Sequence, residues 1–148
     1  MRIAIGSDHA GTELKSAIAD EVKKMGHQVR DFGPEESAQG SVDYPDYAGA
    51  VAGAVAKKDA DLGILICGTG IGMSIAANKI NGIRAAVVWD EFTARMAKQH
   101  NNVNVLCLGS RTTPINRAIE LLKIWLETQF EGGRHQARLD KIQKLEHS

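Results

Sequence analysis

The sequence has 148 residues, and its 18 basic and 18 acidic side chains give a formal net charge of zero. This balance argues against a general nucleic-acid binder, and no apolar run approaches the roughly 18 residues of a membrane span. The length suits one domain, residues 1–148, and the two cysteines lie in apolar runs, so we expect a reduced, cytoplasmic protein without a leader segment.

Short apolar runs alternate with helical patterns along the whole chain. The predicted strands are 3–5, 27–32, 62–67, 84–89 and 103–108, and the predicted helices are 14–25, 45–58, 74–80, 90–100, 114–130 and a last one from about 134. The run 62–67 is apolar on both faces, which is typical of a strand in a parallel sheet. The alternation predicts a single-domain, Rossmann-like α/β fold, a three-layer α/β/α sandwich around a five-stranded parallel sheet.

The first motif, Ser7 to Gly11, directly follows the first predicted strand. Ligands of open α/β sheets bind at the carboxyl edge of the strands, so Asp8 and His9 are well placed to act on one. An equally good interpretation is that Asp8 caps the following helix.

The second motif is Cys67-Gly68-Thr69-Gly70-Ile71-Gly72-Met73-Ser74, between the third strand and a helix. Glycines allow close backbone approach, and the N–H groups at a helix start favour an anion, either a phosphate or an oxyanion formed during reaction. A thiol beside such a cradle can be activated as a thiolate, although most strand cysteines are small core residues.

The same loop also permits a dinucleotide site. Its glycines loosely imitate a dinucleotide-binding loop, and Asp90 ends the next strand about 20 residues further on, where a ribose-binding acid would lie. The spacing is not G-x-G-x-x-G, however, and the chain has no room for a separate substrate domain, so this alternative is the weaker one.

Two further motifs lie in the second half of the chain. His100 ends a predicted helix, where a lone histidine usually serves as a cap. Beyond Gly132-Gly133, Arg134 and Arg138 are four residues apart and share a helix face, which suits a phosphate or an ordinary solvated pair. The same helix carries an apolar stripe of Leu139, Ile142 and Leu145, as expected of a helix that packs this face against another protein surface.

Together these segments resemble ribose-5-phosphate isomerase B, in the family that includes galactose-6-phosphate and allose-6-phosphate isomerases. The matching pieces, in family order, are GSDHAG, DYPDYA, ICGTGIGMSIAANKI, GIRAAVVW, RMAKQHNNVNVLCLGSR and FEGGRHQAR. One branch of the family uses a glutamate base just after the glycine loop. Met73 occupies that position here, which favours Cys67 as the base.

The resemblance implies interconversion of ribose 5-phosphate and ribulose 5-phosphate through an enediolate, in the non-oxidative pentose phosphate pathway, without metal or organic cofactor. The thiolate of Cys67 would move the proton between C1 and C2. The resemblance also implies an oxyanion hole made by the backbone amides of Gly70, Ile71, Gly72, Met73 and Ser74. His100 would open the ring with Asp8, and the sugar would contact Thr69, Tyr44, Asn101 and Gly68. The phosphate would contact His9, Arg134, Arg138 and Arg111.

Chain direction predicts that each site is shared by two subunits. Cys67 leaves a strand at the carboxyl edge of the sheet, whereas His100 and Arg134 follow helices that return to the opposite edge, roughly 17–20 Å away. An antiparallel homodimer, with the last helix docked on the partner, would bring them together. Pairing of dimers into tetramers, the choice between His100 and His135 for ring opening, and the preferred sugar all stay open. The alternatives are a six-carbon sugar-phosphate isomerase and a non-catalytic nucleotide- or phosphate-binding module.

Overall fold

Strands and helices alternate in the computed structural model, which describes residues 1–35, 37 and 40–146. The strands are β1 Arg2–Ser7, β2 Gln28–Asp31, β3 Leu62–Cys67, β4 Ala85–Val87 and β5 Val105–Gly109. The helices are α1 Thr12–Lys24, α2 Tyr44–Ala56, α3 Ile71–Ala77, α4 Glu91–Gln99, α5 Ile115–Glu127 and α6 Arg134–Leu145, with a 3₁₀ turn, η1 His9–Gly11, before α1.

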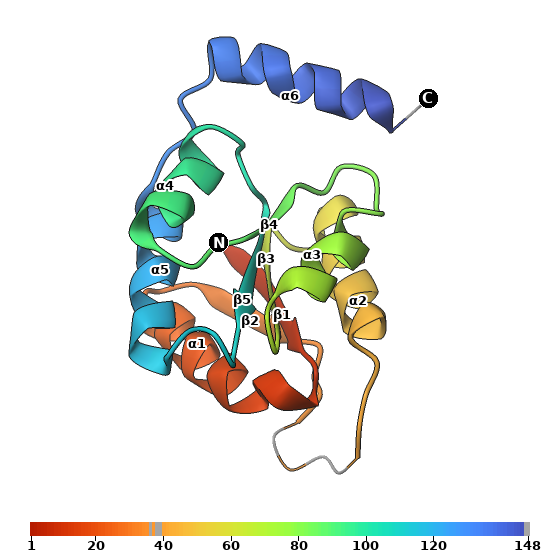
Figure 1. Cartoon of the computed structure of the whole chain (residues 1–148), viewed down its shortest axis with the longest axis vertical. Coiled ribbons are helices and arrows are strands. Elements are labelled where there is room, and N and C mark those ends of the chain that lie inside the picture. Colours follow the sequence, from red (N-terminus) through yellow and green to blue (C-terminus); the bar gives the residue numbers. More distant parts are fainter. Residues whose placement is uncertain (36, 38–39, 147–148) are drawn as a thin grey trace.

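The strands form one parallel sheet in the order β2-β1-β3-β5-β4. Every residue of the central strands β3 and β5 is buried, as a parallel strand covered on both faces requires. Helices α1, α4 and α5 cover one face and α2 and α3 cover the other (Figure 1). The predicted three-layer α/β/α fold with five parallel strands is therefore confirmed.

Two separate cores hold the layers together. One lies under α1, α4 and α5 and contains Ile5, Leu106 and the fully buried Trp125. The other lies under α2 and α3 and contains Leu65, Cys67 and Cys107. Because side chains alternate along a strand, neighbouring residues of β3 feed opposite cores, and Cys67 belongs to the α2/α3 side.

Two predicted boundaries differ from the structure in ways that affect the site. Helix α3 begins at Ile71, not Ser74, because Gly70 adopts a left-handed conformation (φ 81°) that turns the chain straight from the loop into the helix. Strand β4 ends at Val87, not Trp89, because the Trp89 and Asp90 amides donate to the Thr93 hydroxyl at the start of α4.

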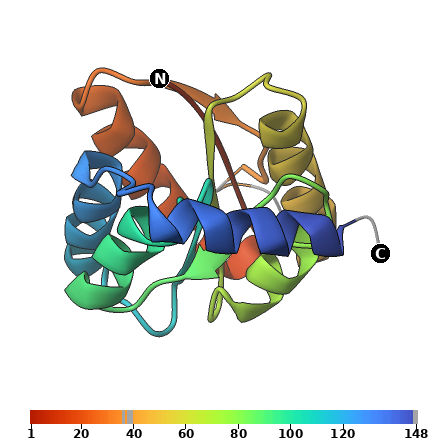
Figure 2. The ribbon, with the colours of Figure 1, turned by 90° about the horizontal axis from the view of Figure 1, so that it is seen from above.

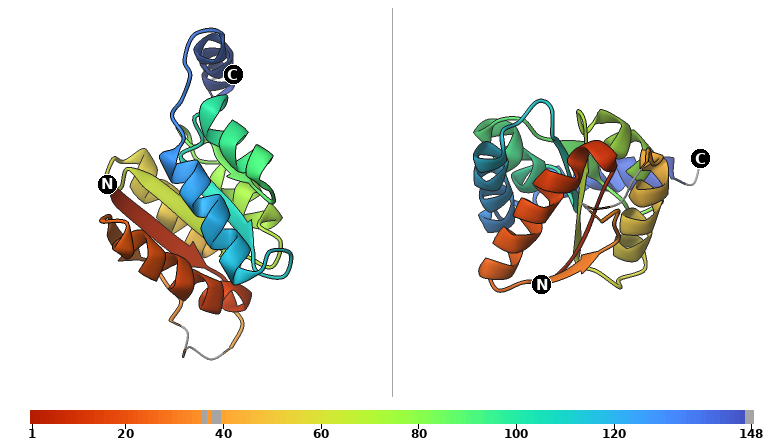
Figure 3. Two further views of the ribbon diagram at one scale, coloured as in Figure 1. Left: turned by 90° about the vertical axis from the view of Figure 1, so that its left-hand side faces the viewer. Right: turned by 90° about the horizontal axis from the view of Figure 1, so that it is seen from below.

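Helix α6 lies across one end of the molecule, beyond the layers of the sandwich, while η1 lies at the opposite end (Figures 1 and 2). Seen from the side, α6 projects past the main body (Figure 3). Its stripe is only partly covered, since Leu139 is buried but Ile142 and Leu145 are 46% and 70% exposed. In the described part of the chain, no helix has the length and apolar character that crossing a membrane requires.

Candidate active site

The first group of predicted site residues gathers where β1 and β3 end. The Asp8 amide donates to the Ile66 carbonyl (3.0 Å), which ties the turn after β1 to the end of β3. Asp8 Oδ1 accepts from the amides of Ala10 (3.0 Å) and Gly11 (3.1 Å). Asp8 is therefore the cap of η1, but among the described residues its second oxygen, Oδ2, accepts no hydrogen bond and stays available to a ligand.

Cys67 lies at the mouth of the glycine loop. Its Sγ accepts a hydrogen bond from the Gly70 amide (3.2 Å), and the side chain is 5% exposed. The loop is tight at Gly70, where an added Cβ would approach the Leu108 backbone within 3.1 Å. Only glycine combines the left-handed conformation with this close packing, so the sequence itself sets the position of the thiol against the start of α3.

The five amides from Gly70 to Ser74 are not equivalent. Gly70 donates to Cys67 Sγ, Ile71 to Thr69 Oγ1 (3.2 Å), and Ser74 to the Gly70 carbonyl (3.1 Å). The amides of Gly72 and Met73 donate to no described residue. These two N–H groups of the first turn of α3 are the donors left for an anion.

Two side chains border this cradle. The Tyr44 ring lies against Gly72, where a Cβ would meet Tyr44 Cζ at 2.6 Å and Oη at 3.0 Å. Arg111 covers Gly68 in the same way, with Nη1 at 3.3 Å from a Cβ placed there. The exposed His9 lies on the neighbouring turn, where its Nδ1 is 3.5 Å from the Val42 amide and the Ser41 hydroxyl. The cradle is thus lined by groups suited to a polar, anionic ligand.

The structure does not bring the second group of predicted residues to this edge within one chain. His100 ends α4, and Asn104, four residues later, accepts from the Gly63 amide (2.9 Å) at the beginning of β3. Cys67 ends the same strand, four residues and about 13 Å further along it. Arg134 and Arg138 are exposed on α6, which lies at the His100 end of the molecule (Figure 1).

A cluster that the sequence analysis did not identify surrounds His100. Its imidazole stacks on that of His135, with ring centroids 4.1 Å apart and an interplanar angle of 13°. Glu131 Oε2 lies 3.1 Å from His135 Nε2, and the Gln99 amide side chain donates to Glu131 Oε1. The hydrogen bond from Gln99, helped by the two imidazoles, holds the pKa of Glu131 below its usual value. Glu131 lies within the motif FEGGRHQAR. Its place in that motif was the only feature of the sequence that pointed to a functional role.

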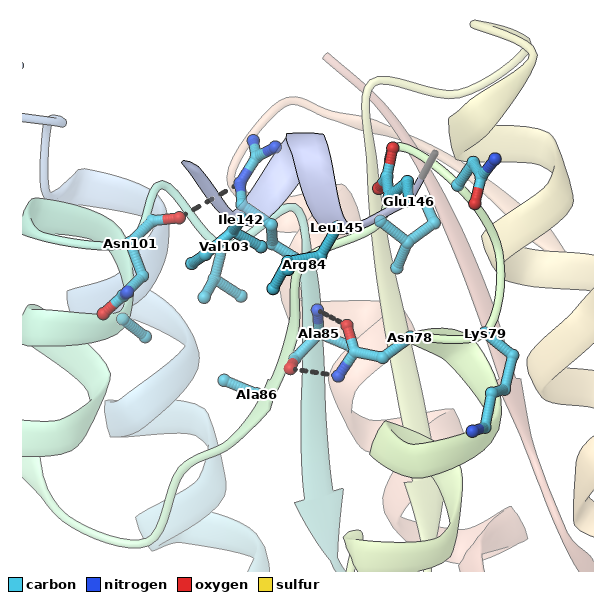
Figure 4. Close-up of a pocket in the computed structure, with 13 residues that line it drawn as sticks. Asn78, Lys79, Arg84, Ala85, Ala86, Asn101, Val103, Ile142, Leu145 and Glu146 are labelled. Carbon is cyan, nitrogen blue, oxygen red and sulfur yellow. Dashed lines mark hydrogen bonds between the residues drawn. The ribbon is translucent and has the colours of Figure 1, made fainter. Parts of the chain in front are cut away.

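Arg84 fixes the chain just after His100. Its Nε donates to the Asn101 and Asn102 carbonyls (3.1 Å each), and its Nη2 donates to Asn102 (2.9 Å). Burial lowers the pKa of this guanidinium. The Asn101 and Asn102 carbonyls nevertheless accept hydrogen bonds from its Nε and Nη2. Beside it, a cavity of about 660 Å³ separates α6 from the main body (Figure 4). Ile142 and Leu145 line this cavity, and no residue of the glycine loop does.

Comparison with known proteins identifies close relatives over nearly the whole chain. Residues 3–142 match the Ribose/Galactose Isomerase family. Ribose-5-phosphate isomerase B of Escherichia coli (strain K12) is 47% identical over 145 residues, which cover 98% of this chain and 96% of that protein.

Solved structures agree in fold as well as in sequence. Ribose-5-phosphate isomerase B of Clostridium thermocellum superposes with a TM-score of 0.96 at 50% identity, covering 99% of this chain and 98% of that one. The Mycoplasma genitalium ribose-5-phosphate isomerase B with bound ribulose-5-phosphate gives a TM-score of 0.94 at 47% identity, covering 99% and 97%. The alignments leave no substantial part of the chain unmatched.

Proposed function

Because the chain belongs to the ribose/galactose isomerase family, we propose that it interconverts ribose 5-phosphate and ribulose 5-phosphate with Cys67 as the proton-transferring base. It is an isomerase, related at 47% and 50% identity to proteins named ribose-5-phosphate isomerase B. One relative was solved with bound ribulose-5-phosphate, the ketose of this pair. The reaction assigned here belongs to the non-oxidative pentose phosphate pathway.

The observation that carries this mechanism is the position of the Cys67 thiol beside two unused amides. Removing a proton next to a carbonyl requires a base and, at the same time, a place for the negative charge. The Cys67 thiolate takes the proton from C2 of the open-chain aldose and returns it to C1. The amides of Gly72 and Met73 hold the oxyanion of the enediolate, while Thr69 and Tyr44 contact the sugar.

Ring opening requires a second subunit. His100 lies a strand length away from Cys67 in its own chain, and no side chain spans that distance. In an antiparallel homodimer, the His100 edge of one subunit covers the Cys67 edge of the other. His100 then opens the furanose ring together with Asp8 of the facing subunit, with Asn101 against the sugar. His135, stacked on His100, is the alternative group for this step and would come from the same subunit.

The phosphate is held from both sides of this interface. His9 approaches from the Cys67 subunit, and Arg134 and Arg138 approach from the subunit that supplies His100. Guanidinium groups four residues apart on one exposed helix face can each donate two hydrogen bonds to a dianion. Arg111, which covers Gly68, is a further cation near the cradle.

Helix α6 supplies part of the dimer contact in this proposal. Ile142 and Leu145 leave a large apolar area exposed in the isolated chain, and covering it with a partner removes that area from water. With both cysteines free and buried, we place the protein in the reducing cytoplasm.

An isomerase assay tests the assigned substrate. We expect the kcat/KM for ribose 5-phosphate to exceed that for allose 6-phosphate and galactose 6-phosphate at least tenfold. Free ribose, which lacks the phosphate, should be a poorer substrate still. A preference for a six-carbon phosphate would reassign the substrate, and absence of turnover on all of them would favour a non-catalytic phosphate-binding module.

A further inference from the structure

Three side chains with metal-ligand chemistry converge beside the end of α4. They are His100 at that end, Glu131 in the turn after α5, and His135 in the first turn of α6. One ligand atom from each lies within 4.8 Å of those of the other two. The turn at Gly132 and Gly133, both with positive φ (70° and 56°), brings α6 back over α4 and so creates the cluster.

The surroundings of His135 indicate an unused ligand atom. His135 is 4% exposed, and its Nε2 has no hydrogen-bond partner among residues that the structure describes. Glu131 Oε2 is 3.1 Å away, an ion-pair distance, but the two atoms lack the direction of a hydrogen bond. A buried nitrogen without a hydrogen bond carries a desolvation cost that a bound cation would offset.

We propose that His100, Glu131 and His135 form a binding site for a divalent cation of the zinc type. Two imidazoles and one carboxylate are ligands that Zn²⁺ accepts readily, whereas Mg²⁺ and Ca²⁺ require oxygen ligands. Three protein ligands leave a fourth position of the tetrahedron for water or a ligand oxygen. The Gln99 side-chain amide donates a hydrogen bond to Glu131 and so orients its carboxylate. Metal-binding side chains are commonly oriented by such a hydrogen bond from a neighbouring group.

Binding must change the position of His100. One ion lies near the ring plane of each imidazole that binds it, and two rings stacked at an interplanar angle of 13° cannot both meet that condition. With zinc–nitrogen bonds of about 2.0–2.1 Å, the two nitrogens lie about 3.3 Å apart. His135 is 4% exposed whereas His100 is only partly buried, so the His100 ring is the one with room to turn out of the stack and toward the ion.

This displacement has a functional consequence that rests on the proposed function. A His100 imidazole bound to zinc cannot exchange a proton with the ring oxygen of the sugar. Zinc therefore inhibits the isomerase reversibly, and a chelator restores it.

The test is a zinc titration of the metal-free homodimer in competition with a chromogenic chelator, without substrate. We expect one Zn²⁺ per chain and at least tenfold weaker binding to Glu131→Gln. The matched control is Glu127→Gln, which alters an exposed glutamate at the end of α5, four residues before Glu131. This variant should bind zinc as the parent does. His135→Asn, checked for its fold by circular dichroism, should also bind at least tenfold more weakly.

The Cys67 thiol could also bind zinc, so the ligands must be identified. Co²⁺ is used in place of Zn²⁺ because its absorption spectrum shows whether a thiolate is bound. We expect Co²⁺ absorption without a thiolate charge-transfer band, unchanged in Cys67→Ala. Equal zinc affinity in Glu131→Gln and Glu127→Gln, or a cobalt spectrum lost in Cys67→Ala, would overturn the site. Because both readouts omit substrate, they stand even if the enzyme isomerises another sugar. Zinc that binds as expected without slowing turnover would overturn the inhibition and count against His100 as the ring-opening group.

Discussion

Two thiols in the same core have very different surroundings. Cys107 is completely buried in β5, and burial, with a smaller contribution from nearby Cys67, raises the pKa of its thiol far above the usual value. Cys67 ends its strand beside the amides of the first turn of α3. Cys107 pairs with Leu65 of the neighbouring strand β3, and Cys67 lies two residues further along that strand. The same residue type is therefore an inert packing group at one position and a candidate base at the other.

Replacing Cys67 by Ala should reduce kcat by about 10²–10⁴-fold, the usual contribution of a general base. Circular dichroism and substrate binding should stay close to those of the parent, because the loop conformation depends on Gly70 rather than on the sulfur. Cys107→Ala is the control and should keep most of its activity. Near-normal turnover of the Cys67→Ala protein would make that thiol a packing residue.

Gly72 is a second position where one atom decides the geometry. A methyl group there would lie 2.6 Å from the Tyr44 ring, so Gly72→Ala must displace Tyr44 or the start of α3. We expect KM for ribose 5-phosphate to rise at least tenfold, measured by steady-state kinetics. Gly53→Ala in α2, where a Cβ meets no atom within 4 Å, should instead stabilise the protein by about 0.5–1 kcal/mol. Unchanged kinetics in Gly72→Ala would remove Tyr44 and this amide from the site.

Helix α4 positions His100 through the contacts at its two ends. At its start, Asp90 and Thr93 form a capping box, in which Asp90 Oδ1 accepts from the Thr93 amide (2.7 Å). At its end, Arg84 binds the carbonyls of the two residues that follow His100. A helix of nine residues has little stability of its own, so these end contacts act together with the packing of α4 against α5 to position the imidazole.

The capping box predicts a pH effect. The hydrogen bond from the Thr93 amide holds the pKa of Asp90 below its usual value. A lowered pKa gives stability that is present above the unfolded value, about 3.9, and is lost as the pH falls through the lower folded value. Asn caps a helix almost as well but does not titrate.

We therefore expect the free energy of unfolding of Asp90→Asn to approach that of the parent as the pH falls from 7 to about 3. Urea denaturation at several pH values measures this difference. Asp20→Asn, which alters an exposed carboxylate on α1, controls for the loss of one surface charge. A difference between Asp90→Asn and the parent that does not change with pH would show that the carboxylate gains nothing from the cap.

The complete molecule separates its chemical groups between opposite ends. The thiol, the amide cradle and Asp8 belong to the segments that follow the carboxyl ends of β1 and β3. His100 and His135 stack where α4 ends and α6 begins, and α6 lies at the opposite end of the molecule (Figure 1). The cavity beneath α6 belongs to the second end and has an apolar wall formed by Ile142 and Leu145. A single chain therefore carries two incomplete halves of the proposed site.

Mixing two inactive homodimers tests this arrangement. Cys67→Ala and His100→Ala proteins should each be nearly inactive. After subunit exchange, each mixed dimer should regain up to half of the parent activity, because one of its two sites then has both groups intact. Exchange is followed by native mass spectrometry or by a tag on one variant. Proven exchange without recovery would place Cys67 and His100 of one chain in the same site.

Local sequence patterns were enough to predict most of the secondary structure and the sheet of this protein. Alternation of apolar runs and helical periodicity predicted the parallel sheet and its helices, because both depend on side-chain spacing over a few residues. The presence of a glycine loop after Cys67 was predictable for the same reason, since glycine permits the left-handed conformation that Gly70 adopts. Chain direction in a β-α alternation was enough to predict that His100 and Cys67 lie at opposite edges.

Other features depend on contacts between distant segments, which no local pattern encodes. Among the five amides from Gly70 to Ser74, those of Gly72 and Met73 have no partner in the described residues. This pattern follows from the exact start of α3, which depends on the packing of Gly70 on Leu108 in β5. The stacking of His100 on His135 depends on how α6 returns over α4 after Gly132 and Gly133. Residues 35 positions apart meet only because the whole fold brings those two helices together, so the tertiary structure alone decided the cluster that they form with Glu131.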